Sequence, residues 1–191
     1  MIRRSRRAFT LIELVVYAAL LGMLMTALYF VLTSVLRSFK EEQTATDLQS
    51  SAQVAVAQLR MDLGDSHAAS IVTNSNPSAV IFPSPRDLND LFSWDSAGNI
   101  FWWSWVCYYQ DSSNNLWRKS ITITPTSTPP TGPPSVASFV SAPGGRIVAS
   151  NLTSFVVSTG AACTVQATFS KQALRSGDNA LTVSVVVRPR N

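Results

Sequence analysis

Hydrophobic residues are concentrated near the N-terminal end of the chain. Residues 14–36 include no charged side chain, and as an α-helix these 23 residues would span about 34 Å, which is enough to cross the hydrocarbon core of a membrane. Four arginines precede this stretch, whereas residues 37–42 after it carry two basic and two acidic side chains. Because positively charged flanks remain in the cytoplasm, the pattern predicts a single-pass protein with a cytoplasmic N-terminus and an exported C-terminal part.

The helical pattern continues beyond the uncharged stretch. Residues 37–63 contain no Pro or Gly, and apolar side chains recur at spacings of three and four residues, which places them on one helix face: Leu48, Ala52, Ala55, Leu59 and Leu63. Gly64 and the polar residues after it are typical of a helix end. We therefore predict one helix over residues 9–63, with a membrane and assembly half at 9–36 and an amphipathic half at 37–64.

From Ile71 onward the pattern changes to short β-type runs separated by turn-rich segments. The run at 100–109 is apolar on both faces, as expected for a central strand that the long helix covers on one side. The sequence DSSNN after Gln110 predicts a hairpin turn, and the Pro-rich residues 125–134 predict an exposed loop outside any strand ladder. The predicted strands are residues 79–82, 100–109, 116–124, 146–149, 152–159, 163–169 and 181–188.

These elements predict an α+β fold, in which residues 65–191 form an exported β-rich head and the long helix packs on an antiparallel sheet. In the last strand, alternate residues are apolar, so one face is expected to point to the core.

The charge distribution limits the partners that the chain is expected to bind. The formal net charge of +4 resides in Arg3, Arg4, Arg6 and Arg7, and from Phe9 onward eleven Lys and Arg balance eleven Asp and Glu. A nucleic-acid interface needs cations clustered on the folded domain. We interpret the basic run as a topology signal, and the charge balance of the head disfavours nucleic acid as a partner.

The two cysteines, Cys107 and Cys163, lie far apart in the sequence and lack the spacing of metal ligands. In an exported domain a disulfide between them would stabilise the fold by roughly 4 kcal/mol in the chain-entropy description. Two separate buried thiols that behave as small hydrophobic side chains are the other interpretation. The sequence leaves both interpretations open.

Residue types that would indicate an enzyme are few. The chain has one histidine, His67, so a histidine-dependent catalytic group has no second member. The string GDSH at 64–67 is similar to the nucleophile block of GDS-type esterases, but it follows a helix instead of a strand. Asp62 and Asp65 with His67 would offer ligands to a cation, although acidic residues near a helix end usually face water. We expect no enzyme activity, no cofactor and no metal site.

Two interpretations of the N-terminal segment leave one residue unexplained. The sequence SRRAFT at residues 5–10 resembles a twin-arginine export signal, but the hydrophobic stretch is long and no small-residue cleavage site follows it. A plain signal anchor explains the span and its flanking charges but gives no role to Glu13. A carboxylate within a membrane span is costly and usually has a partner and a function, with a glutamate that extends to the water interface as the other interpretation.

A third interpretation explains Glu13. The string RRAFTLIELVVYAALLGMLMTAL closely resembles the leader and helix start of type IV prepilins and type II secretion pseudopilins. The resemblance implies a class III signal, in which prepilin peptidase removes residues 1–8 by cutting between Ala8 and Phe9, and Phe9 becomes N-methylated. Glu13 is then the fifth residue of the mature chain. The new amine at Phe9 would pair with this glutamate, on a neighbouring subunit or locally, so that docking of the helix into a filament depends on one charge pair.

Two positions depart from the family pattern. Ala8 replaces the usual Gly before the cut, and we expect cleavage because Ala is also small. Phe30 stands where the family commonly has a helix-kinking proline, which favours a minor, tip-type subunit over a major pilin. The string WVCYYQDSSNNLWRKSI is similar to a hairpin of minor pilins and J-type pseudopilins and favours the same choice.

An aromatic cluster surrounds this hairpin and has two interpretations. Its side chains form the core beneath the helix, or part of them form a surface for partner subunits or a ligand. The cluster consists of Phe101, Trp102, Trp103, Trp105, Tyr108, Tyr109 and Trp117.

The resemblance implies a pilin-like fold and a minor pilin or pseudopilin in a tip or priming complex, for pilus assembly, DNA uptake in competence or type II secretion. The expected partners are other pilin-like subunits, prepilin peptidase, the inner-membrane assembly platform and membrane lipid. The expected location is the inner membrane, with the head periplasmic, and then the filament. The alternative function is a filament-borne adhesin or DNA-binding receptor.

Overall fold

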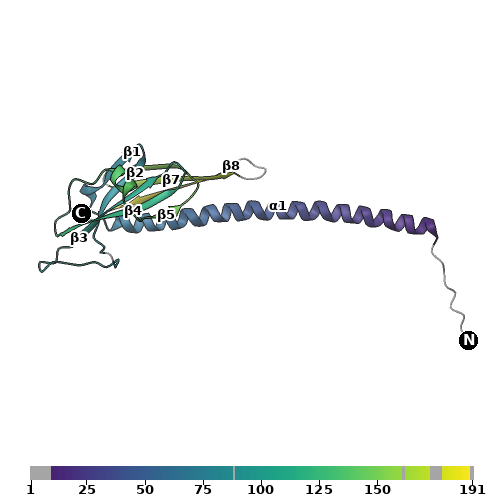
Figure 1. The fold of residues 1–191 in the computed structure, drawn as a ribbon, viewed down its shortest axis with the longest axis horizontal. Helices are drawn as coiled ribbons and strands as arrows, with labels where there is room; N and C mark the ends of the chain where they lie inside the picture. The colour runs from purple at the N-terminus through teal and green to yellow at the C-terminus, as the bar shows by residue number, and fades with distance from the viewer. Residues whose placement is uncertain (1–9, 88, 161, 173–177, 190–191) are drawn as a thin grey trace, which may run out of the picture. The chain divides into compact units, whose positions relative to one another are not determined.

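The computed structural model describes residues 10–189 except 88, 161 and 173–177. The chain divides into one unit of Met1–Gln43 and a second of Thr44–Asn191, and helix α1 (Leu11–Gly64) contributes residues to both (Figure 1). The second unit therefore takes in much of the predicted amphipathic half of the helix along with the head. The predicted cleavage and methylation sites, Ala8 and Phe9, lie outside the described residues.

The first unit consists of the apolar part of α1. Within the described residues, α1 is the one helix long and apolar enough to cross a membrane, judged by length and composition. Its hydroxyl side chains bond to carbonyls one turn earlier: Thr26 Oγ1 donates to Gly22 O at 2.8 Å and Thr33 Oγ1 to Tyr29 O at 2.9 Å. Polar groups satisfied within the helix are compatible with a lipid environment.

The second part of α1 confirms the predicted amphipathic stripe. Leu48, Ala52, Ala55, Leu59 and Leu63 are each 0–3% exposed and join the main hydrophobic core. The helix ends at Gly64, where Ser66 Oγ donates to the Leu63 carbonyl at 2.6 Å. A 3₁₀ turn, η1 (Ala68–Ser70), follows.

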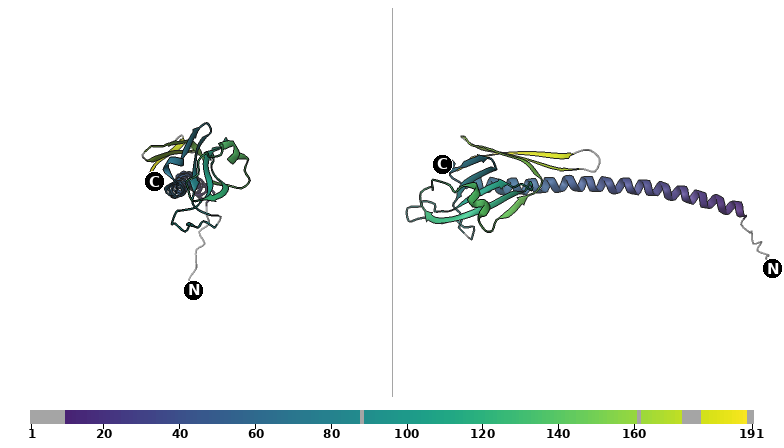
Figure 2. Two further views of the ribbon diagram at one scale, coloured as in Figure 1. Left: turned by 90° about the vertical axis from the view of Figure 1, so that its left-hand side faces the viewer. Right: turned by 45° about the horizontal axis from the view of Figure 1, so that its top comes forward.

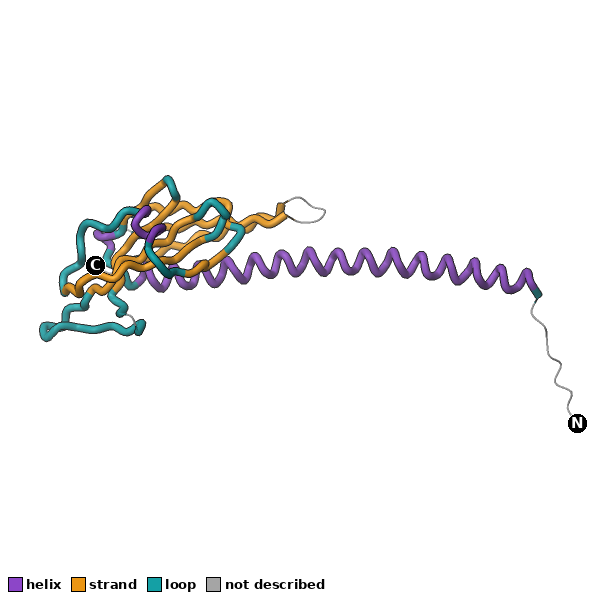
Figure 3. The backbone as a smooth tube through the Cα atoms, viewed as in Figure 1, coloured by secondary structure: helices purple, strands orange, loops and turns teal. Residues whose placement is uncertain are grey.

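A five-stranded antiparallel sheet has the order β1-β2-β3-β4-β5. Its strands are β1 (Val72–Ser75), β2 (Ser78–Ser84), β3 (Trp102–Gln110), β4 (Leu116–Thr126) and β5 (Arg146–Ala149), and Figure 3 shows them in orange with their connecting loops in teal. The prediction that residues 100–109 form a central strand is confirmed. Val106 and Tyr108 face the core beneath α1, and Trp105 and Cys107 face a second cluster.

A three-stranded antiparallel sheet completes the head, in the order β6-β7-β8. The strands are β6 (Leu152–Ser158), β7 (Cys163–Gln172) and β8 (Asp178–Val187), and Figure 2 shows β8 in yellow along the edge of this sheet. The predicted alternation of β8 is confirmed, because Leu181, Val183, Val185 and Val187 all pack on the main core. The predicted α+β class, a long helix on antiparallel sheet, is thereby confirmed.

Helix α2 (Val136–Ser141) covers the second face of the large sheet and was not predicted. Val136 and Phe139 pack on Trp105 and Cys107 there. Six residues between Pro-rich and Gly-rich segments are too few to show a helical period. Strand β1, which follows η1, was also not predicted. All four of its residues are exposed, so the sequence shows no alternation of apolar and polar side chains there.

The predicted boundary of the Pro-rich loop is wrong by two residues. Strand β4 extends to Thr126, so Pro125 lies inside it. The ladder with β3 shifts register between Trp102 and Ser104, and residues 123–125 of β4 have no paired residue across it. A proline is tolerated where the ladder is interrupted, because no backbone N–H is needed there.

Candidate functional site at the two ends of helix α1

Helix α1 begins with a reciprocal pair of hydrogen bonds. The Thr10 side-chain oxygen accepts the backbone N–H of Glu13 at 3.3 Å, and Glu13 Oε2 accepts the backbone N–H of Thr10 at 3.4 Å. This is the capping-box arrangement, in which two residues three apart satisfy each other's free donors. Glu13 therefore has a local role in starting the helix. Sequence reasoning did not identify Thr10, although the spacing T-x-x-E before an apolar run was the available signal.

The apolar part of α1 presents an extensive hydrophobic surface. Every large hydrophobic side chain within residues 11–39 is exposed in the first unit, from 43% at Val35 to 83% at Leu11. A surface of this size is unfavourable in water and requires lipid or other apolar helices around it. The segment is thus suited to membrane anchoring and to helix–helix packing.

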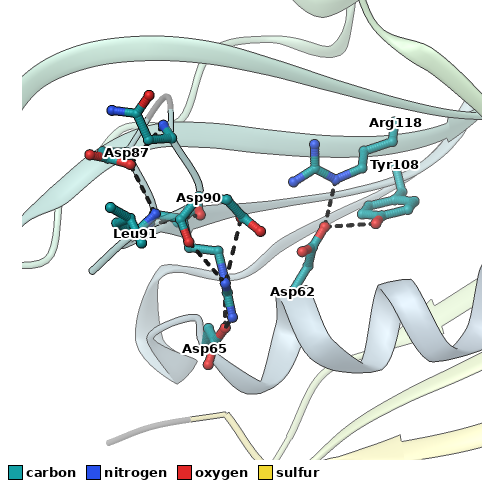
Figure 4. Close-up of polar contacts among 10 residues, drawn as sticks. Asp62, Asp65, Asp87, Asp90, Leu91, Tyr108 and Arg118 are labelled. Carbon is teal, nitrogen blue, oxygen red and sulfur yellow. Dashed lines mark hydrogen bonds and ion pairs between the residues drawn. The ribbon is translucent and has the colours of Figure 1, made fainter.

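The last turns of α1 are joined to the sheet by a buried acidic residue. Asp62 Oδ2 accepts a hydrogen bond from Arg118 Nε at 2.6 Å and another from the Tyr108 hydroxyl at 2.7 Å (Figure 4). The Asp62 side chain is 4% exposed and that of Arg118 is 22% exposed. Burial lowers the pKa of the Arg118 guanidinium, but the bond to Asp62 and its charge outweigh this and leave the pKa above its ordinary value. Burial, followed by the Asp62 charge, raises the pKa of the Tyr108 phenol.

A second ion pair, between Asp65 and Arg86, lies just after the end of α1. Arg86 Nη2 and Nε both donate to Asp65 Oδ2, at 2.7 and 3.0 Å, and Arg86 Nη1 lies 3.5 Å from the carboxylate of Asp90. The Arg86 guanidinium also stacks over the Phe92 ring at 4.7 Å. The helix end is thereby held both to the sheet, through Arg118, and to the loop between β2 and β3, through Arg86.

Three turns of the head share one construction, each starting from an aspartate: Asp87, Asp95 and Asp111. Oδ1 of each accepts the backbone N–H groups two and four residues later, at 2.8–2.9 Å. The residue three positions later has positive φ in every case, and the residues are Asp90, Gly98 and Asn114. The hairpin turn predicted after Gln110 is thus confirmed.

The turn at Asp111 has additional bonds. Its Oδ2 accepts the indole N–H of Trp117 at 2.8 Å and the side-chain amide of Asn115 at 3.1 Å. Partial burial pushes the pKa of Asp111 upward, but the hydrogen bonds from Asn115 and Trp117 outweigh it and hold the pKa below its ordinary value. Hydrogen bonds to the charged form account for this direction.

The expectation that the acidic residues near the helix end face water is wrong for Asp62, which is buried because Arg118 and Tyr108 satisfy it. Asp65 is engaged with Arg86, and His67 packs edge-on against Trp102 with its Nδ1 buried and unpaired. Within the described ranges no group of three or more potential ligands could hold a metal ion.

The aromatic cluster predicted around the hairpin lies mainly in the core. Trp102, Trp105, Tyr108 and Tyr109 are buried. The other three members, Phe101, Trp103 and Trp117, are half-buried. The more exposed large side chains of the head include Leu91 and Trp94, in the loop between β2 and β3, which the sequence did not single out.

The two cysteines are free and buried, so the disulfide is not formed in this structure. Cys107 lies in the cluster beneath α2 and Cys163 in the core beneath α1, on different sides of the head. Burial raises the pKa of the Cys107 thiol to about 12, and burial also raises the pKa of Cys163. Both thiols behave as small hydrophobic side chains, which is the second of the two interpretations of the sequence.

Comparison with known proteins bears on the N-terminal segment. A family model described as the prokaryotic N-terminal methylation motif matches residues 3–29. A search of curated proteins and a search of solved structures found no match to the chain. The matched segment includes the basic run, the Ala8–Phe9 bond, Glu13 and the first part of the exposed apolar surface.

Proposed function

We propose, from the premise that the chain is a member of the type IV prepilin-like family, that it is a minor pilin or pseudopilin of a tip or priming complex. The motif at residues 3–29 carries this proposal. It implies processing by prepilin peptidase, membrane anchoring and assembly as a pilin-like subunit. The subunit would serve pilus assembly, competence or type II secretion, as a structural protein and not as an enzyme.

The proposed processing site is the Ala8–Phe9 bond, with N-methylation at Phe9. Before cleavage the head would be held outside the inner membrane by α1, with the N-terminus in the cytoplasm. The exposed apolar side chains of residues 11–39 support this arrangement, because they suit lipid before assembly and neighbouring pilin-like helices afterwards. The inner-membrane assembly platform would transfer the processed chain between these surroundings.

Glu13 is proposed as the assembly residue. Its bonds with Thr10 are long, at 3.3 to 3.5 Å, and therefore weak. An amine created at Phe9 would be a stronger partner, because both groups carry charge and water is excluded around them. During assembly, an incoming subunit whose Glu13 meets the amine of its neighbour would then be favoured over a subunit with an uncharged residue at that position.

The test separates the charge of Glu13 from its role in capping the helix. Glutamine also serves in a capping box, so Glu13→Gln keeps the helix start and removes the charge, whereas Thr10→Ala removes the cap and keeps the charge. Both variants are expressed in place of the native chain. Leader removal is scored by intact mass, and incorporation is scored by immunoblotting of sheared filaments. We expect Glu13→Gln to be cleaved but poorly incorporated, and Thr10→Ala to be incorporated.

Normal incorporation of Glu13→Gln would refute the assembly role. An equal loss of incorporation in both variants would show that Glu13 acts only by capping the helix. The minor role is tested separately by the number of copies per filament. A strain that lacks the chain, scored in parallel for piliation, DNA uptake and secretion, identifies the machine.

A further inference from the structure

A polar cavity of about 230 Å³ lies on the head between β3, β4 and the loop after β2. A neighbouring cavity of about 430 Å³ reaches the last turns of α1, and Asp90, Arg118 and Ser120 line both. We refer to the two together as the hydroxyl cleft. All of its residues belong to the second unit, and none of them takes part in the assembly role proposed for α1.

The floor of the hydroxyl cleft is a row of side-chain hydroxyls from three adjacent strands. Ser84 of β2 is paired in register with Ser104 of β3, which is paired with Thr122 of β4. Ser84 Oγ accepts the backbone N–H of Arg86 at 3.3 Å. Among the described residues, the hydroxyls of Ser104 and Thr122 have no hydrogen-bond partner. Each can donate one hydrogen bond and accept two.

Arg118 adds oriented donors to this floor. Its Nε is held by Asp62, which fixes the plane of the guanidinium, while its two terminal nitrogens have no partner within the described part of the chain (Figure 4). A guanidinium held in this way presents donors in a fixed geometry at low entropic cost. The neighbouring Arg86 is already engaged with Asp65 and Asp90.

The cleft carries no net charge. The charges that line it are three guanidiniums and three carboxylates, those of Arg86, Arg118, Arg146, Asp62, Asp87 and Asp90. An anion would gain from the arginines but would be repelled by the carboxylates, and a cation would meet the opposite balance. This lining therefore fits a neutral ligand that both donates and accepts hydrogen bonds.

One wall of the cleft is aromatic. Trp103 lines the smaller cavity, and its ring is held in place by a hydrogen bond from its indole N–H to Ser93 Oγ at 2.8 Å. An indole face offers apolar contact to a ligand whose edge is polar. A neutral pyranose combines an apolar ring face with hydroxyls around its edge.

We propose that the hydroxyl cleft binds a neutral pyranose unit of a carbohydrate. The Arg118 terminal nitrogens would donate to sugar hydroxyls, Ser104 and Thr122 would donate to and accept from them, and Trp103 would contact the ring face. Such a site would allow a filament subunit to recognise a glycan. It goes beyond the assembly role, and a failure of Glu13-dependent incorporation would leave it unaffected.

The test uses the full chain in a detergent without a sugar head group. Saturation-transfer NMR against a panel of neutral hexoses and N-acetylhexosamines is followed by titration of those that bind. Free sugars are compared with their methyl glycosides, which represent units linked in a glycan chain. We expect saturable, millimolar binding of at least one neutral pyranose that is unchanged by added sodium chloride, because no net charge is involved.

Two variants locate the site. Thr122→Val and Ser104→Ala each remove one hydroxyl and should weaken binding roughly three- to ten-fold, the value of one hydrogen bond. Thr124→Val, on the same strand but outside the cavity lining, should bind as the parent does, and thermal unfolding checks that all three variants remain folded. Glucuronate is added to the panel as a charged sugar. Three outcomes would overturn the proposal: no neutral sugar binds, only glucuronate binds and does so in a salt-sensitive manner, or binding is equal in the three variants.

Discussion

The buried contact of Asp62 makes a strong prediction about the stability of the head. Replacing Asp62 with Ala removes the acceptor of two short hydrogen bonds, at 2.6 and 2.7 Å, and leaves the charge of Arg118 without its partner. An unpaired buried hydroxyl, here that of Tyr108, costs about 1 to 3 kcal/mol. Breaking a buried ion pair costs about 3 to 5 kcal/mol, and the cost falls toward the lower end here because Arg118 also lines a cavity open to water. We expect a loss of about 3 to 4 kcal/mol in the free energy of unfolding.

The assay is urea unfolding of the full chain in detergent, followed by tryptophan fluorescence. All five tryptophans lie in the second unit, so the signal reports on the head. Arg118→Ala and the double variant complete a mutant cycle, for which we expect a coupling energy of about 1 to 3 kcal/mol. Asp47→Ala, an exposed aspartate on the same helix, is the matched control and should change stability by less than about 0.5 kcal/mol. A loss below about 1 kcal/mol for Asp62→Ala, or strict additivity in the cycle, would refute the reasoning.

Three further predictions concern the β-rich head. Because the pKa of Asp111 is lowered, its carboxylate contributes stability that is present above about pH 4 and is lost as the pH falls through the folded-state pKa. Asp111→Asn should flatten this loss of stability in acid titrations that are followed by tryptophan fluorescence, and an unchanged profile would contradict the prediction. Gly145→Ala should destabilise the head by more than about 1 kcal/mol, because φ is +96° and the new Cβ would lie 2.5 Å from Lys119 Cγ; an unshifted urea midpoint would contradict the contact. Cys107 should resist maleimide at neutral pH until the head unfolds, since burial raises its pKa to about 12, and rapid labelling of the native protein, read by mass spectrometry, would contradict its burial.

The features that the sequence predicted well depend on local periodicity. The three-and-four spacing from Leu48 to Leu63 places these side chains on one face without any knowledge of what they pack against, and all of them are buried. The same holds for the alternation of β8 and for the turn after Gln110, where the aspartate and the residue with positive φ are three positions apart.

The features that the sequence did not predict depend on register between distant segments. Asp62 and Arg118 are 56 residues apart, and only the pairing of β3 with β4 brings Tyr108 and Arg118 to the same carboxylate. The same pairing of strands creates the hydroxyl row through Ser104, since no local pattern connects serines of three strands. Cys107 and Cys163 fail to meet for the same reason, because strand register places them in separate clusters.

The two ion pairs at the end of α1 also explain what fixes its position on the sheet. Hydrophobic burial has no direction, so a helix slid by one turn would still bury part of its apolar stripe, with Leu48 in the place of Ala52 and Ala55 in the place of Leu59. Such a shift would also place Gln58 where Asp62 meets Arg118, which would leave the guanidinium without a charge partner. The bond of Asp65 to Arg86 would break in the same movement. Packing therefore attaches the helix to the head, and the buried charge pairs favour one register, because a helix that slides loses both pairs.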